Sequence, residues 1–240
     1  MIGYHACWII NLFGLAFSNE IITGSAFTVW ERSICMTFIL IAGFSFSLGH
    51  RHLRSGLLIF GLGLAITVIT SLILPQIRIV FGVLTFLGTA TLIMIPIDKV
   101  LKGCSTKKRS FPIAGLVIFF LLFLLTYNIN KGFIGFGENA RIFLPKWLYS
   151  GYFATFLGFT QASFFSADYF SLIPWFFWYM CGYFLHKIVK GTYIEEDILS
   201  HGIKGISTVG RHSQVIYIIH PIVLYVLIFL LSLWLVQKPV

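Results

Sequence analysis

Long runs without charged residues make up most of the chain and alternate with short polar segments. Eight stretches lack Asp, Glu, Lys and Arg, and they cover residues 1–19, 33–49, 55–77, 79–97, 110–130, 147–167, 169–185 and 213–237. Each reaches the lower limit for a helix that crosses a bilayer, about 17 residues. The pattern predicts an all-α, polytopic integral membrane bundle whose helices are joined by short polar loops.

The sixth stretch decides between seven and eight spans. Residues 147–167 are rich in Gly, Ser, Thr, Tyr and Gln, and only Asp168 separates them from the next stretch. If they do not cross, Lys and Arg divide eleven to six between the two sides, whereas crossing divides them eight to nine. Cytoplasmic loops carry an excess of Lys and Arg. The charges therefore favour seven spans and a cytoplasmic N-terminus, and eight spans are the alternative. With seven spans, residues 129–170 form a long outer segment that partly lies in the interface or dips into it.

Composition agrees with a single multi-pass domain over residues 1–240, which we expect in the plasma membrane. Charged residues make up 10% of the chain, whereas a soluble domain has about 25%. The net charge of +9 does not indicate a nucleic-acid partner, because the basic residues lie in short loops between apolar runs. The four cysteines are scattered singly, so no disulfide framework and no metal site is indicated.

Small residues recur in the second and third predicted spans and indicate close helix packing, because small side chains let helix backbones approach each other in lipid. They are Ala42, Gly43, Ser45, Ser47 and Gly49 in the second, and Gly56, Gly61 and Gly63 in the third.

Two histidines, His5 and His220, lie inside apolar stretches. His220 follows Arg211 by nine residues, which is roughly 14 Å along a helix and near the middle of a bilayer. A titratable group inside lipid is expensive, so each is a functional candidate. The structural alternative is a neutral histidine hydrogen-bonded between helices.

A second candidate is Gly210-Arg211-His212-Ser213, at the mouth of the last predicted span. A guanidinium matches two phosphate oxygens at once, so this segment suits a phosphate-bearing donor on the cytoplasmic face. The run Lys107-Lys108-Arg109 is a weaker candidate of the same kind. For both, the alternative is a basic segment that only flanks the membrane.

A third candidate runs from Asp168 to Trp175 at the outer end of a predicted span. A carboxylate and an aromatic face suit a hydroxylated substrate such as a sugar. The alternative is an interfacial belt, because Trp and Tyr favour that depth.

Six short sequence segments, spread over nearly the whole chain, follow one another in an order that matches a known family. They are Met1–His5, Ile41–Ser45, Phe81–Leu84 with Phe86–Gly88, Asp168–Trp175, Gly210–Ser213 and Tyr217–Pro221. In order and spacing they resemble the catalytic domain family of heparan-alpha-glucosaminide N-acetyltransferase and its bacterial relatives.

The resemblance implies transfer of an acetyl group from cytoplasmic acetyl-CoA to an amino sugar or related acceptor on the far side. In this family an intramembrane histidine carries the acetyl group or acts as a general base, and a histidine suits either role. The roles then expected are catalysis for His5 and His220, donor binding for Arg211, His212 and Ser213, and acceptor binding for Asn11, Asp168 and Trp175. A homodimer is compatible with this interpretation.

The chain also departs from the family pattern. Relatives open the first helix with a charged segment ending in Arg-Gly and carry an Asp four residues after the histidine, where this chain has Ile9. Position 85, bulkier and polar in relatives, is Thr85. The resemblance thus implies a first helix without its start. Two alternatives stay open: a transporter of a small polar or lipid-linked solute, and a non-catalytic remnant of the family.

Overall fold

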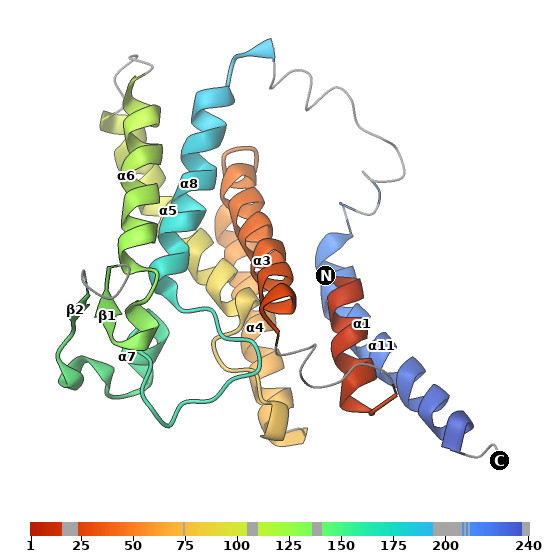
Figure 1. The fold of residues 1–240 in the computed structure, drawn as a ribbon. Helices are drawn as coiled ribbons and strands as arrows, with labels where there is room; N and C mark the ends of the chain where they lie inside the picture. Colours follow the sequence, from red (N-terminus) through yellow and green to blue (C-terminus); the bar gives the residue numbers. More distant parts are fainter. Residues whose placement is uncertain are drawn as a thin grey trace. The chain divides into compact units, whose positions relative to one another are not determined.

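The computed structural model describes residues 1–15, 24–73, 75–104, 110–135, 141–193, 208, 210 and 212–236. The chain divides into two compact units (Figure 1). The first unit comprises Met1–Thr37 and Gly191–Val240, and the second comprises Phe38–Lys190. The α-helices are α1 (Ile2–Leu12), α3 (Ser25–Phe46), α4 (His52–Ile73), α5 (Val83–Cys104), α6 (Ser110–Thr126), α7 (Tyr152–Leu157), α8 (Leu172–Val189) and α11 (Ser213–Val236).

Short elements complete the described fold. They are the 3-10 turns η1 (Pro75–Ile77), η2 (Ile129–Lys131) and η3 (Lys146–Tyr149), and an antiparallel pair of strands, β1 (Phe133–Ile134) and β2 (Ile142–Phe143). Phe133 pairs with Phe143 and Ile134 with Ile142. Because the sheet is this small, the prediction of an all-α membrane bundle is confirmed.

Among the described residues, five helices are long and apolar enough to cross a membrane: Ser25–Phe46, His52–Ile73, Val83–Gly103, Ser110–Lys131 and Val215–Leu235. Each overlaps one of the predicted stretches. α1 has 11 residues and is therefore about 16 Å long, whereas α8 has 18 and reaches about 27 Å. A hydrocarbon core is about 30 Å thick, so α8 nearly matches it and α1 does not.

The sixth apolar stretch forms no long helix. Between 147 and 167 the longest helix is α7, with six residues, which is about 9 Å. The stretch instead contains η3, α7 and extended chain that packs on the ends of neighbouring helices. It therefore belongs to a folded segment between α6 and α8, as the choice of seven over eight spans requires.

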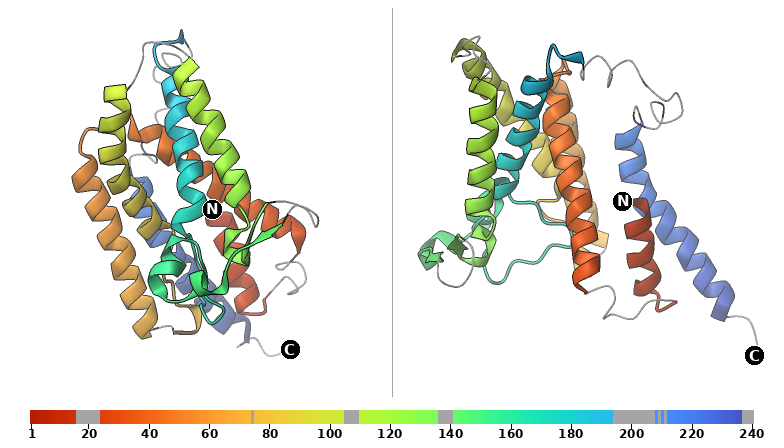
Figure 2. Two further views of the ribbon diagram at one scale, coloured as in Figure 1. Left: turned by 90° about the vertical axis from the view of Figure 1, so that its left-hand side faces the viewer. Right: turned by 45° about the horizontal axis from the view of Figure 1, so that its top comes forward.

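In the second unit, α8 lies in the core and has eight buried residues, among them Tyr179, Tyr183 and Phe184. Figure 2 shows α3, α4, α5 and α6 beside it from two further directions. Glycines set the closest approaches. A Cβ on Gly43 would overlap the carbonyl oxygen of Tyr179, and one on Gly182 would overlap that of Leu40. The backbones of α3 and α8 therefore touch directly.

Glycines also bring α4 and α5 close together. A Cβ on Gly63 would lie 2.6 Å from the backbone nitrogen of Thr85, and one on Gly88 would lie 2.5 Å from that of Phe60. Gly56 faces the Leu92 side chain at similar range. The close packing predicted for Gly43, Gly56 and Gly63 is confirmed. For Gly61 it is wrong, because no atom lies within 4 Å of its Cβ position.

A polar contact joins α5 to α8 near their C-terminal ends. It consists of Asp98 and Lys102 on α5 and Tyr183 on α8, and we name it the Asp98 staple. The hydroxyl of the fully buried Tyr183 donates to Asp98 Oδ1 at 2.6 Å, and Lys102 Nζ lies 2.6 Å from Asp98 Oδ2. Lys187 Nζ lies 5.1 Å from the centre of the Tyr183 ring. The carboxylate thus has a partner on each oxygen, the neutral phenol of Tyr183 on Oδ1 and the ammonium group of Lys102 on Oδ2, which offsets much of the cost of its partial burial.

Basic residues collect at this end of the second unit, where α3, α5 and α8 finish and α4 begins. They are Arg51, Arg54, Lys99, Lys102, Lys187 and Lys190, while Arg78, Lys131, Arg141 and Lys146 lie at the opposite end. The bias within this unit has the sign used to predict orientation.

Candidate functional site

In the first unit, α1 packs against α11 through three aromatic contacts. The rings of His5 and His220 lie 5.1 Å apart, and Phe13 lies 5.3 Å from Tyr225 and 6.0 Å from Phe229. Residue numbers rise together along both helices, so α1 and α11 run parallel. If both cross the membrane, parallel first and last helices require an odd number of spans, as the seven-span prediction does.

The histidine pair joins two residues from opposite ends of the chain. His220 is buried, with 8% of its surface exposed, and its Nδ1 lies 2.9 Å from the carbonyl oxygen of Ile216. A carbonyl only accepts, so Nδ1 carries a proton, and in the neutral imidazole Nε2 then has the lone pair. Among the residues that the structure describes, Nε2 is buried and has no hydrogen-bond partner. The arrangement therefore offers a proton acceptor next to the half-buried His5 ring.

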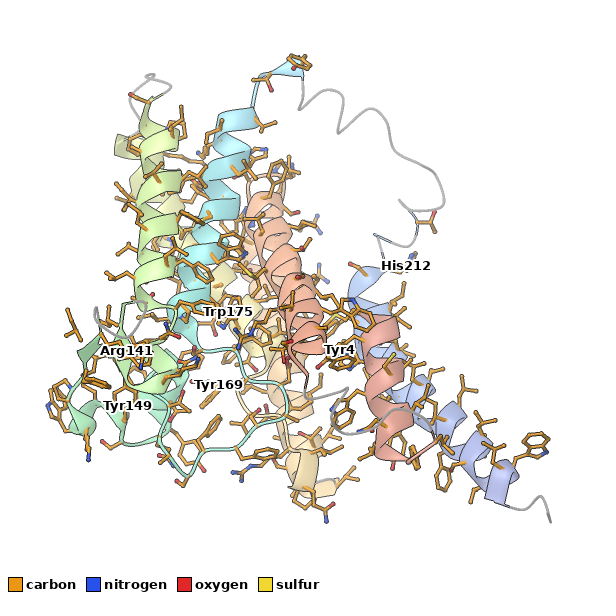
Figure 3. All side chains as sticks on the ribbon, viewed as in Figure 1. Tyr4, Arg141, Tyr149, Tyr169, Trp175 and His212 are labelled. Carbon is orange, nitrogen blue, oxygen red and sulfur yellow. The ribbon has the colours of Figure 1, made fainter. Side chains whose placement is uncertain are left out.

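Aromatic side chains surround the pair. Tyr4 stacks on Phe27 at 4.6 Å and meets Trp30 edge-on at 5.8 Å, and its ring lies 5.6 Å from His5. On α11, Tyr217 lies 5.9 Å from His220. Figure 3 labels Tyr4 on α1. Apolar ring surface next to an imidazole keeps water away and strengthens any charge interaction formed there.

The predicted donor residues lie at the start of α11. His212 is exposed and its Nδ1 lies 3.0 Å from the carbonyl oxygen of Thr208. Ser213, also exposed, is the first residue of α11, and the positive end of a helix dipole favours an anion there. Arg211 and the run Lys107-Lys108-Arg109 lie outside the described residues. Eight residues separate His212 from His220, or about 12 Å of helix.

Asn11 lies on α1, six residues after His5. At about 100° per residue, this offset turns its side chain roughly 120° away from that of His5. The two side chains therefore do not share a face of the helix, and the histidine pair forms without Asn11.

Asp168 and Trp175 belong to the second unit. Asp168 Oδ2 accepts the backbone N–H of Val83, the first residue of α5, at 3.0 Å. A Cβ on Gly82 would lie 2.8 Å from the same oxygen. Trp175 on α8 packs its ring 5.3 Å from Phe170 and 5.9 Å from Phe123. The carboxylate thus caps a helix N-terminus, where negative charge is favourable.

Asp168 is part of a larger contact between residues 78–83 and 165–170, which we name the clasp. The N–H of Val80 donates to Ser166 Oγ at 2.9 Å, that of Ala167 to the Arg78 carbonyl at 3.0 Å, and that of Phe170 to the Phe81 carbonyl at 2.9 Å. These bonds fasten the segment before α8 to the turn between α4 and α5. Asp168 therefore shapes the end of the second unit at which α5 and α8 begin.

Sequence reasoning missed three features. The Asp98 staple was not predicted, because Asp98 directly follows an apolar stretch and was read only as the boundary of that stretch. The spacing of four residues between Asp98 and Lys102 could have indicated an ion pair on one helix face. The ring cluster around Tyr4 and the hydroxyl network of Tyr169 had no local signal. Tyr169 donates to the Thr155 carbonyl and lies 2.9 Å from Thr160 Oγ1.

The family described as "Heparan-alpha-glucosaminide N-acetyltransferase, catalytic" matches residues 1–222 of the chain. Searches of curated proteins and of solved structures gave no match.

Proposed function

Because the chain belongs to the catalytic-domain family of heparan-alpha-glucosaminide N-acetyltransferase, we propose that it moves an acetyl group from cytoplasmic acetyl-CoA to an amino sugar or related acceptor across the membrane. Family membership carries the broad role, a membrane acetyltransferase-like protein. The donor, the acceptor, the plasma-membrane location and the cytoplasmic N-terminus are parts of the proposal.

The observation that carries the proposal is the contact between His5 and His220. Two imidazoles from distant parts of the sequence lie ring to ring at 5.1 Å, and the buried His220 Nε2 keeps its lone pair. Acetyl transfer to an amine needs a group that accepts the amine proton or carries the acetyl group, and imidazole does either. A pair built only for packing would not need this nitrogen.

His5 acts at the transfer point in this proposal, and His220 supports it. The fixed Nδ1–H of His220 turns Nε2 into an acceptor for a proton that leaves the reacting centre. When the acceptor nitrogen bonds to the acetyl carbon, the C–S bond of the thioester breaks and the thiolate leaves. The amine proton passes to imidazole.

The remaining predicted residues bind the substrates. His212, Ser213 and Arg211 meet the phosphates of the donor on the cytoplasmic side, where the exposed start of α11 suits an anion. Asn11, Asp168 and Trp175 contribute to acceptor binding. Because one Asp168 oxygen accepts a hydrogen bond within the clasp, we assign acceptor recognition to the negative charge of the carboxylate.

The test is acetyl transfer from labelled acetyl-CoA in proteoliposomes. We expect His5→Ala to lower the rate about 10²- to 10⁴-fold, the range for loss of an acid–base group. His50→Ala is the matched control, because His50 is exposed at an end of the second unit. Undiminished transfer by His5→Ala would remove His5 from the mechanism, and solute flux without an acyl donor would favour a transporter.

A further inference from the structure

The segment between α6 and α8 carries a group of large apolar side chains that point away from the rest of the described protein. Their exposed fractions are 69% for Ile142, 74% for Phe143, 73% for Trp147, 59% for Tyr152 and 74% for Phe153. They come from β2, η3 and α7, and we name them the outer apolar face. Soluble surfaces seldom gather so many large apolar groups without a partner.

The opposite side of the same segment is firmly packed. The Tyr149 hydroxyl donates to the Ile129 carbonyl at 2.7 Å, and its ring meets Phe159 edge-on at 5.6 Å. Thr155 is fully buried and donates to the Gly151 carbonyl at 3.0 Å. These contacts hold the segment in a defined conformation, and this conformation leaves the outer apolar face exposed.

Hydrogen bonds fix the depth of this face relative to a membrane span. The Gly135 N–H donates to the Leu125 carbonyl in the last turn of α6 at 3.1 Å, and the Leu144 N–H donates to the Gly132 carbonyl at 2.9 Å. The candidate span that contains α6 runs to Lys131. The hairpin of β1 and β2 therefore doubles back beside the end of the span, at the level where hydrocarbon meets headgroups.

Basic side chains border the outer apolar face. Lys131, Arg141 and Lys146 are all exposed, and the Arg141 guanidinium lies 5.0 Å above the Phe133 ring. Figure 3 labels Arg141 next to the hairpin and Tyr149 below it. Trp, Tyr, Lys and Arg are typical of the membrane–water interface. There, aromatic rings enter the headgroup layer and cationic side chains contact lipid phosphates.

We infer that the outer apolar face lies in the outer interface of the bilayer and binds phospholipid, with Lys131, Arg141 and Lys146 meeting lipid phosphates. A second copy of the chain fits the face less well. A symmetric contact there would bring the three cations against their equivalents, and lysine is depleted in protein interfaces.

Fluorescence of Trp147 in proteoliposomes tests the inference without any need for activity. The chain has six tryptophans, so the Trp147 signal is the difference between wild type and Trp147→Phe. Quenchers are phosphatidylcholine spin-labelled at the headgroup or deep in the acyl chain, and aqueous iodide. We expect strong quenching by the headgroup label and weak quenching by the other two. Trp178→Phe supplies the control, because Trp178 packs 4.9 Å from Phe123 inside the second unit and should not respond to the headgroup label.

Two results would overturn the inference. Quenching by iodide with none from lipid labels would place Trp147 in water, and protection from every quencher would place it against protein, as in a second copy. The cations are tested by spin-labelled anionic phosphatidylglycerol. We expect it to quench Trp147 more than the zwitterionic lipid does, and Arg141→Gln with Lys146→Gln to lower this preference about twofold to fivefold per residue. An unchanged preference would remove the phosphate contacts from the account.

Discussion

The two units hold their helices together by different means. In the second unit, glycines bring backbones into contact, and the partly buried carboxylates of the Asp98 staple and of the clasp each accept a hydrogen bond. In the first unit, rings join α1 to α11, and a buried imidazole nitrogen has no hydrogen-bond partner among the described residues. The second unit also buries two hydroxyl oxygens without a hydrogen-bond partner among the described residues, Ser47 Oγ and Thr85 Oγ1, so the units differ in how their helices are joined and in the imidazole chemistry that the histidine pair offers.

This difference assigns separate roles to the units. We expect the second unit to act as a scaffold, in which substitutions change stability more than the rate per folded molecule. We expect the histidine pair of the first unit to show the reverse.

The largest effect should come from Gly182→Ala. Its Cβ would overlap the Leu40 carbonyl, which is backbone and has little room to move. We expect a loss of more than about 3 kcal/mol, beyond ordinary overpacking, or no folded protein. Gly61→Ala is the control, because nothing lies within 4 Å of its Cβ position, and alanine is the better helix former. Unfolding in mixed micelles titrated with SDS measures both, and equal stabilities would refute the backbone contact.

The Asp98 staple should matter less. Tyr183→Phe removes one hydrogen bond to a carboxylate and keeps the ring, so we expect a loss of about 1–2 kcal/mol. The transfer rate per folded molecule should stay within about twofold, a shift of a few tenths of a kcal/mol in the barrier. Tyr193→Phe, at an exposed position, should leave both quantities unchanged. A large loss of acetyl-transfer rate with an unchanged free energy of unfolding would show that the Asp98 staple takes part in the reaction.

Asp168 separates the structural role of the clasp from acceptor binding. Asp168→Ala removes the cap on Val83 and should cost about 1 kcal/mol of unfolding free energy. Asp168→Asn keeps an oxygen that can accept this bond, so its stability should change by only a few tenths of that. If the charge recognises the acceptor, both variants raise the acceptor KM. A normal KM in Asp168→Asn would limit Asp168 to the clasp.

The smallest effect is a dependence on alkaline pH. Burial raises the pKa of the Tyr169 phenol above its ordinary value, so the folded state holds this proton more tightly than the unfolded state. The resulting stabilisation is complete below about pH 10 and is lost as the pH rises through the folded pKa. Tyr169→Phe should lack this component. Identical pH profiles of unfolding for the two proteins would contradict it.

Helix positions were predictable because apolar runs must be buried or face lipid, but helix ends were not. α3 includes Glu31 and Arg32, and α5 continues through Asp98 and Lys102, because charged side chains near a span end can reach the interface. In the first stretch of 19 residues, α1 already ends at Leu12.

The sequence singled out the two histidines of the candidate site but not their contact or the rings around them. His5 and His220 were identified because ionisable groups in lipid are costly, yet their contact depends on the parallel packing of α1 and α11. The use of Asp168 as a cap was not predictable, because its partner Val83 is 85 residues away. Long-range hydrogen bonds of this kind leave no periodic signal in a sequence.

The most direct test of the account is a double-mutant cycle on His5 and His220, measured as acetyl transfer in proteoliposomes. If the two imidazoles work as one unit, His5→Ala lowers the rate about 10²- to 10⁴-fold, and the double variant is no slower than the worse single variant. Losses that multiply, with both variants as stable as the wild type, would show that the histidines act independently and would contradict the central claim.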